Sequence, residues 1–241
     1  MEDVIILEVK NLTIKVGDNT IVSNLNFKVT KGETLAVIGP NGAGKSMLFR
    51  ALLGLIPFKG EVIWAPGVKI GYVPQKLHIE KNLPLSVSEF LEFKNNGKGI
   101  KEVLVLTGLA DRKILHKKLG ALSGGELQRV IIAWSILDNP DVILFDEPMT
   151  GIDIGGEETI YSLIHNLNHA KDSTMLIISH DLSVVYKYAN SVLCINKKQI
   201  CIGSPSEVIN DKNTRKLYGE LTTHYNHAHQ LENEHNNLLN K

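Results

Sequence analysis

One stretch of the chain combines small residues, a lysine and a hydroxyl side chain at a fixed spacing. It matches the pattern G-x-x-x-x-G-K-[ST] at every fixed position, between an apolar run and a helical pattern. Glycines let successive backbone N–H groups turn inward around phosphate oxygens, and the following helix adds its positive N-terminal end. Lys45 would reach the β- and γ-phosphates, and Ser46 would ligate Mg²⁺. We therefore predict a phosphate-binding loop formed by Gly39, Pro40, Asn41, Gly42, Ala43, Gly44, Lys45 and Ser46.

Two acidic residues, Asp146 and Glu147, follow the apolar run 142–145. Ligands bind outside the carboxyl ends of parallel strands, so we expect both acids at the edge of the sheet that carries the phosphate-binding loop. Asp146 could hold Mg²⁺, and Glu147 could polarise an attacking water as a general base. Taken alone, the pair could also be solvated acids at a strand end, but the upstream loop favours the joint site.

The rest of the pattern predicts an α/β protein. A β-rich N-terminal layer precedes the loop, and the order strand, helix, strand after residue 142 is typical of buried parallel strands. Gly17-Asp18-Asn19 and Lys31-Gly32 are turn candidates. We expect strands at 5–9, 21–29, 34–38, 61–64, 69–73, 142–145 and 175–178, helices at 45–55 and 157–170, a largely helical stretch at 84–119, and a hairpin at 192–203.

Composition excludes several classes of protein. Twenty-six Lys and Arg residues balance twenty-six Asp and Glu residues without a basic block, so a nucleic-acid partner is unsupported. The longest apolar runs are shorter than the roughly 20 residues that a membrane-spanning helix needs. The first residues carry no export signal, and Cys194 and Cys201 are too few for a secreted disulfide framework, so we expect a cytoplasmic location.

A further motif, Leu122-Ser123-Gly124-Gly125-Glu126, begins an apolar helical pattern. Its generic interpretation is an N-capped helix whose free N–H groups could bind an anion. The motif resembles the signature sequence of ABC-type ATPases, and the resemblance covers roughly residues 6–220. It implies the ABC type of the P-loop NTPase fold, with an N-terminal antiparallel β-layer, a parallel-sheet core and a small helical subdomain. It also implies that Ser123, Gly124 and Gly125 bind the γ-phosphate of a nucleotide held by a second copy of the chain.

Three more residues take their roles only from this resemblance. Gln75, in Gly71-Tyr-Val-Pro-Gln75, resembles the glutamine that senses Mg²⁺ and the attacking water. Asp153, in Gly151-Ile-Asp153, resembles the loop that crosses the dimer interface, and His180 resembles the histidine that contacts the γ-phosphate. One chain holds one loop and one signature, so the implied assembly is an isologous dimer that sandwiches two ATP molecules.

The chain also departs from the family pattern. Relatives often carry an aromatic residue that stacks on adenine about where Val16-Gly17 stands, so adenine would rest on an aliphatic surface here. Trp134 replaces a common arginine, and Met149 replaces a common threonine. We interpret both of the latter changes as packing variations.

The resemblance also suggests a biological role. The single cassette and the short, heptad-free segment between Gln75 and Ser123 favour a stand-alone transporter subunit over repair or translation machines. Its expected partners are a separate integral membrane permease, docked through the helical segment at 76–119, and indirectly an extracytoplasmic metal-binding protein. The expected location is the cytoplasmic face of the inner membrane. Non-catalytic stretches, including residues 71–77 and 192–203, most resemble the ATP-binding subunits of zinc and manganese importers, zinc in particular. A manganese, iron or other solute transporter and an ATP-dependent regulatory switch stay open as alternatives.

The cysteines and two histidines offer weaker sites. If Lys197-Lys198 forms a turn, Cys194 and Cys201 face each other across the hairpin, and we favour a reduced pair of small hydrophobic residues over a metal site. His165 and His169 have helical i, i+4 spacing but fall on the solvated face, so we interpret them as surface residues.

The histidine-rich tail offers the highest density of metal ligands. Domain boundaries are expected at 1–221 for the ATPase domain, with the helical subdomain inserted at about 76–135, and at 222–241 for a flexible tail. Imidazole suits Zn²⁺, and a flexible segment can gather several ligands. Zinc binding, a solubilising end and an added recombinant tail all stay open, although the dispersed histidines argue against the last. The candidate zinc ligands are His224, His227, His229 and His235.

Overall fold

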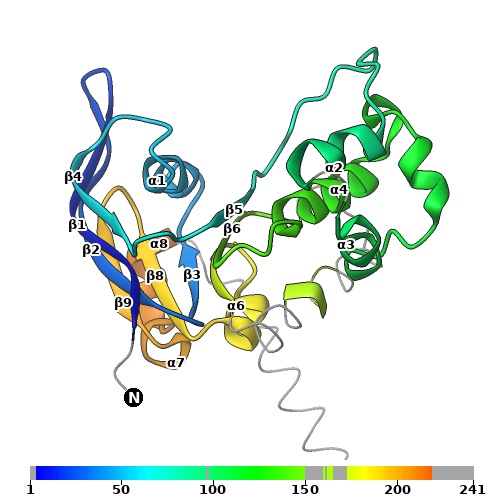
Figure 1. Ribbon diagram of the computed structural model, residues 1–241. Coiled ribbons are helices and arrows are strands. Elements are labelled where there is room, and N and C mark those ends of the chain that lie inside the picture. The colour runs from blue at the N-terminus through cyan, green and yellow to red at the C-terminus, as the bar shows by residue number, and fades with distance from the viewer. Residues whose placement is uncertain (1–3, 96–97, 150–159, 161, 165–172, 219–241) are drawn as a thin grey trace, which may run out of the picture.

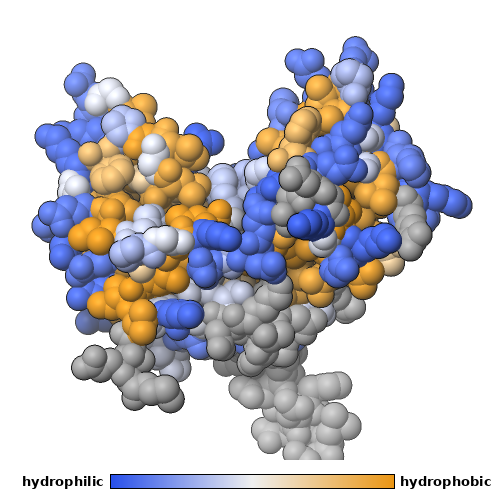
Figure 2. All heavy atoms as spheres, viewed as in Figure 1, coloured by the Kyte–Doolittle hydropathy of each residue, from blue (hydrophilic) through white to orange (hydrophobic). Residues whose placement is uncertain are grey.

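The computed structural model describes residues 4–95, 98–149, 160, 162–164 and 173–218 of the chain. Two lobes meet in Figure 1: the strands with α1, α6, α7 and α8 form one, and α2, α3 and α4 form the other. The surface between the two lobes is hollowed in the same view (Figure 2). Within the described residues, no helix is long and apolar enough to cross a membrane.

A six-stranded sheet forms the centre of the larger lobe. Its order is β5-β6-β7-β3-β8-β9, with five parallel strands and β9 antiparallel to β8. All residues of β3, β6 and β7 are buried, which explains their continuous apolar sequences. The strands are β3 (Thr34–Ile38), β5 (Ile70–Val73), β6 (Val142–Asp146), β7 (Thr174–Ile178), β8 (Ser191–Ile195) and β9 (Gln199–Gly203).

The predicted antiparallel β-layer is present as a second, three-stranded sheet. It has the order β2-β1-β4, formed by β1 (Ile5–Val16), β2 (Asn19–Thr30) and β4 (Lys59–Trp64). Its first two strands are longer than the predicted runs, and Gly17-Asp18 forms the turn between them, as expected. Its apolar side chains pack with α1 (Lys45–Leu52) against one face of the central sheet.

Helix α1 is three residues shorter than predicted. Gly54 has φ +69° and its N–H bonds to the carbonyl of Ala51, while the N–H of Leu55 bonds to that of Arg50. A left-handed glycine with these reversed bonds ends a helix, which the apolar pattern alone does not reveal.

The smaller lobe contains α2 (Val87–Asn95), α3 (Ile100–Leu106) and α4 (Gly124–Ile136). The predicted helical stretch at 84–119 is correct for α2 and α3, but two 3₁₀ turns, Arg112–His116 and Leu119–Ala121, replace its end. The helices share one apolar cluster with the sheet residues Val73, Ile143 and Phe145. This cluster therefore joins the two lobes.

Three short helices pack on the face of the central sheet that is opposite the antiparallel sheet and α1. These are α6 (Leu182–Tyr188), α7 (Pro205–Val208) and α8 (Asp211–Tyr218), packed on Ala36, Ile38, Val192 and Cys194. The predicted helix at 157–170, with His165 and His169, lies almost entirely outside the described residues.

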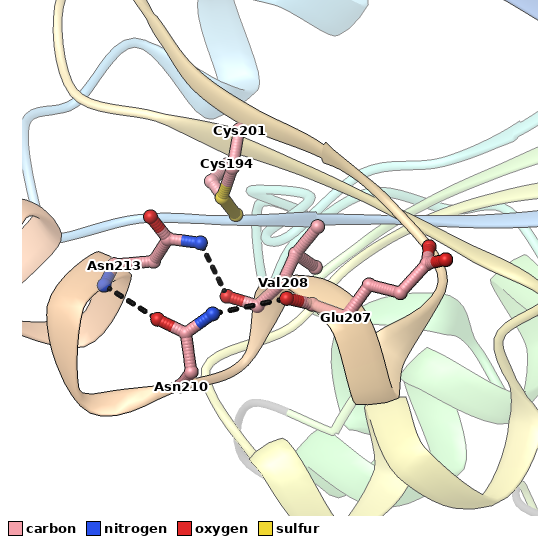
Figure 3. Close-up of a disulfide and its surroundings, with 6 residues drawn as sticks. All are labelled: Cys194, Cys201, Glu207, Val208, Asn210 and Asn213. Carbon is pink, nitrogen blue, oxygen red and sulfur yellow. Dashed lines mark hydrogen bonds between the residues drawn. A yellow bond between two sulfur atoms is a disulfide. The ribbon is translucent and has the colours of Figure 1, made fainter.

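The cysteine pair corrects one expectation. The hairpin places Cys194 directly opposite Cys201, as predicted, but the two residues are joined by a disulfide rather than reduced (Figure 3). Their Cα atoms lie 4.9 Å apart, within the span that a disulfide bridges. Direct cross-strand pairing therefore brings the thiols close enough to bond.

The junction between the lobes generates a stability prediction. Phe145 is fully buried in the shared apolar cluster, whereas Phe93 on α2 is 77% exposed. Phe145→Ala should lower the free energy of unfolding by about 3–5 kcal/mol, because it leaves a cavity where both lobes pack. The matched control Phe93→Ala should change it by no more than about 0.5 kcal/mol in chemical denaturation. Equal effects of the two substitutions would contradict this view of the junction.

Candidate nucleotide-binding site

The predicted phosphate-binding loop connects β3 to α1 and is held against its neighbours by close backbone contacts. A Cβ atom on Gly39 would lie 2.0 Å from the Ile195 carbonyl oxygen, so a side chain there would displace β8. Gly44 has φ +97° and would place a Cβ atom 2.3 Å from a Val22 methyl group. Glycine is therefore required at both positions for the loop to lie between β8 and β2.

Lys45 begins α1 and points back into the loop. Its Nζ donates hydrogen bonds to the carbonyl oxygens of Gly39, at 2.8 Å, and Pro40, at 3.1 Å. Burial lowers the pKa of Lys45, and the nearby carboxylates of Glu147 and Asp146 partly oppose this shift. The ammonium group thus lies within the curve of the loop, where it could meet phosphate oxygens.

Asp146, the last residue of β6, lies beside the loop. Its Oδ1 accepts a hydrogen bond from Ser46 Oγ at 3.0 Å, and its Oδ2 accepts one from Tyr72 Oη at 3.4 Å. Burial raises the pKa of Asp146, the Ser46 hydrogen bond opposes the shift, and the charge of Glu147 adds to it. A hydroxyl and a carboxylate oxygen side by side are the hard ligands that Mg²⁺ prefers, so the donor set fits this ion.

Glu147 and Gln75 meet at the same edge of the sheet. Gln75 Nε2 donates a 2.6 Å hydrogen bond to Glu147 Oε2, and Glu147 Oε1 lies 4.0 Å from Lys45 Nζ. Glu147 has φ +48°, a conformation that non-glycine residues rarely adopt. Such backbone strain is frequent at functional sites. The Glu147 carboxylate contacts Gln75, whereas the Asp146 carboxylate contacts Ser46.

A cavity of about 950 Å³ brings most of the predicted residues together. Its size falls within the range of small-molecule sites. It is lined by Ile21, the whole loop from Gly39 to Ser46, Met47, Gln75, Glu147, His180 and Tyr218. Ile21 and Tyr218 carried no functional signal in the sequence, because only the fold brings β2 and the end of α8 to the loop.

Val16 is the residue expected near adenine. Val16 is 52% exposed and is absent from the described residues that line the cavity. Ile21 from β2 supplies an aliphatic wall, and Tyr218 supplies an aromatic one.

The signature residues form a helix start away from this cavity. Ser123 Oγ accepts a hydrogen bond from the Glu126 N–H, and the Glu126 carboxylate accepts one from the Ser123 N–H, which is a capping box. Ser123, Gly124 and Gly125 are not among the described residues that line the cavity. Asp153 and the tail histidines His224, His227, His229 and His235 lie outside the described residues.

Within the part of the chain that the structure describes, no group of three or more His, Cys, Asp and Glu residues could hold a metal ion.

The sequence matches the family model described as ABC transporter over residues 22–150. The zinc import ATP-binding protein ZnuC of Haemophilus ducreyi is 38% identical over 239 residues, covering 97% of this chain and 89% of the relative. ZnuC of Rickettsia conorii is 38% identical over 234 residues, covering 93% of this chain and 98% of the relative.

Solved structures agree with the fold. The cbiO1 protein of Clostridium perfringens, part of the ABC transporter complex cbiONQ, has a TM-score of 0.72 at 26% identity, covering 96% of this chain and all of that chain. The dimeric bacterial ABC transporter cassette MJ0796 has a TM-score of 0.70 at 25% identity, covering 83% of this chain and 98% of that chain. The chain therefore belongs to the ABC transporter family, in the group of the zinc import ATP-binding proteins.

Proposed function

We propose that the chain is the ATP-hydrolysing subunit of an ABC importer and that the imported ion is zinc. One observation supports the chemistry above all: Lys45, Ser46, Gln75 and Glu147 line one cavity, and Asp146 is joined to it by the hydrogen bond from Ser46. Membership in the group of zinc import ATP-binding proteins supports the choice of ion.

The loop would hold the phosphates of ATP. Backbone N–H groups from Asn41 to Gly44 would surround the oxygens, Lys45 would neutralise the β- and γ-phosphates, and the N-terminal end of α1 would add its partial positive charge. Ser46 and Asp146, with Gln75 nearby, would hold Mg²⁺, which when bound neutralises charge on the phosphates. Burial lowers the pKa of Lys45, and the charges of Glu147 and Asp146 oppose this shift and so favour the charged ammonium group.

Glu147 is the candidate general base. It would accept a proton from the water that attacks the γ-phosphorus, while the bond to the leaving ADP oxygen breaks. One carboxylate oxygen already accepts the Gln75 amide, so Gln75 fixes the side chain and leaves the other oxygen to face the cavity. His180, which lines the cavity from the end of β7, would contact the γ-phosphate.

A second copy of the chain would complete each site. Ser123, Gly124 and Gly125 form a capped helix start whose free N–H groups can bind an anion, yet this start does not line the cavity of its own chain. An isologous dimer would bring it to the partner's nucleotide, with Asp153 at the interface. A related cassette with a similar fold is dimeric.

Transport would require a separate integral membrane permease and, indirectly, an extracytoplasmic metal-binding protein. The chain would lie peripherally on the cytoplasmic face of the inner membrane and dock through its helical segment at 76–119. We divide the chain into an ATPase domain at 1–221, with the helical subdomain inserted at about 76–135, and a tail at 222–241. Transport of manganese, iron or another solute is a less supported alternative, and a regulatory ATP-dependent switch is the alternative from another class.

The tail would add a cytosolic zinc sensor. His224, His227, His229 and His235 supply imidazole ligands that suit Zn²⁺. The last described residue before the tail, Tyr218, lines the nucleotide cavity. The described part of the chain therefore ends at the proposed ATP site, and the tail continues from there.

The role of Glu147 is tested by Glu147→Gln. Steady-state ATP hydrolysis should fall by about 10²–10⁴-fold, because an amide cannot accept the proton of the attacking water. ATP binding should persist, so gel filtration with ATP should show a trapped dimer. The control Glu61→Gln, on the exposed face of β4, should hydrolyse ATP at the wild-type rate. Unchanged turnover of the Glu147 variant would remove it as the base.

The identity of the ion is tested in cells. Deleting the gene should lower cellular zinc content and slow growth under zinc chelation, and added zinc should restore both. A plasmid carrying Glu61→Gln should complement the deletion, whereas one carrying Glu147→Gln should not. Equal rescue by manganese, or no rescue by zinc, would contradict zinc import.

The tail is tested by truncation after Leu221. Basal ATPase activity should be unchanged, because the residues proposed to bind and hydrolyse ATP lie between Gly39 and His180, before the tail. The response of ATPase activity to added Zn²⁺ should be lost. An identical zinc response in the full and truncated chains would show that the tail is only a polar end.

A further inference from the structure

Tyr72, the third residue of β5, lies between the signature helix and the candidate metal site. Its backbone pairs in parallel with Leu144 of β6, two residues before Asp146. Its carbonyl oxygen accepts a 2.7 Å hydrogen bond from Ser135 Oγ, and Ser135 on α4 is fully buried. The Tyr72 backbone is therefore held by β6 on one side and by α4 on the other, which fixes the position from which its side chain extends.

The Tyr72 hydroxyl completes a two-sided clamp on Asp146. Ser46 Oγ donates to Oδ1 at 3.0 Å from α1, and Tyr72 Oη donates to Oδ2 at 3.4 Å from β5. The two donors come from different elements and hold different carboxylate oxygens, which determines the rotation of the carboxylate plane. The Tyr72 bond is long for an O–H···O contact, and bonds at such sites often shorten in the substrate complex.

Between the Tyr72 hydroxyl and the Asp146 carboxylate the hydroxyl is the donor, because an ionised carboxylate only accepts. The Arg50 guanidinium lies beside the same hydroxyl. Arg50 lies one turn after Ser46 on α1. Tyr72 and Asp146 are both absent from the described residues that line the nucleotide cavity, and Tyr72 reaches the site through its hydrogen bond to Asp146.

We propose that Tyr72 is a positioning residue for Mg²⁺, acting by holding Asp146 in the rotation that presents Oδ1 toward Ser46 and the phosphate-binding loop. The inference rests on the proposed function, because it takes Ser46 and Asp146 as the residues that hold the metal. Groups that orient a metal ligand typically change metal affinity by about 10–100-fold when removed. Tyr72 would therefore set the affinity for the metal, while the loop sets the affinity for the nucleotide.

The test uses Mn²⁺ as a probe that can be followed by electron paramagnetic resonance in the full chain with a non-hydrolysable ATP analogue. Tyr72→Phe removes only the hydroxyl and should weaken Mn²⁺ binding about tenfold. Binding of the analogue in EDTA should be unchanged, and raised Mg²⁺ should restore most ATPase activity. The control Tyr186→Phe removes a hydroxyl that donates to Ile209 O on the far helices and should bind Mn²⁺ like wild type.

A rescue experiment separates positioning from packing. Replacing Tyr72 with p-aminophenylalanine keeps an N–H donor on the same ring position and should restore Mn²⁺ affinity even if Tyr72→Phe lowers the melting temperature. Wild-type Mn²⁺ affinity in Tyr72→Phe, or no rescue by the amino variant, would overturn the inference. Asp146→Asn distinguishes the two proposals: if it leaves Mn²⁺ binding intact, the proposed metal site itself fails, whereas loss there without loss in Tyr72→Phe overturns only the role of Tyr72.

Discussion

Parallel pairing of β3, β5, β6 and β7 is the constraint on which the rest of the structure depends. Parallel strands end at a common sheet edge, so the residues after each strand are brought together however far apart they lie in the chain. The loop follows β3, and Gln75 follows β5. Asp146 ends β6 and Glu147 comes directly after it, and His180 follows β7. All residues of β3, β6 and β7 are buried. A shift in the register of these strands would therefore expose apolar side chains and also move the site residues apart.

This edge gathers charges that the interior would otherwise exclude. Lys45 and Asp146 are both almost fully buried. Burial lowers the pKa of Lys45 and raises the pKa of Asp146, which in both cases favours the neutral form. Loop carbonyls, the Ser46 hydroxyl and the opposite charges compensate for lost water. The compensation uses small groups already required by the fold, so the site keeps a cation and two carboxylates close together without a large polar network.

The extent of agreement between sequence and structure follows from the range of the interactions involved. The loop, the buried strands and the hairpin turn are local patterns, and each was predicted at or near its place. The Gln75–Glu147 contact spans 72 residues and was not predicted, because family resemblance supplied only the role of Gln75, while Tyr72 and Tyr218 gave no signal at all. The pairing of Cys194 with Cys201 was predicted, but their reduced state was wrong, because the prediction rested on the compartment and not on the short cross-strand distance. The end of α1 was wrong because a left-handed glycine stops a helix whose apolar pattern continues.

The β8–β9 hairpin packs directly against the phosphate-binding loop. The Ile195 carbonyl lies where a Gly39 side chain would be, and the Lys197 N–H bonds to the Ala43 carbonyl at 3.4 Å. On its other side the hairpin meets β2, through the Ser23 N–H, and the end of α8, through the Asn196 amide and the Leu217 carbonyl. The side chains of Asn210 and Asn213 bind the turn between α7 and α8, as Figure 3 shows. The loop is therefore supported by a hairpin that is itself closed by a disulfide and held by β2 and α8. A glycine-rich loop gains its definite shape from such neighbours, since glycine alone has the greatest backbone freedom of any residue.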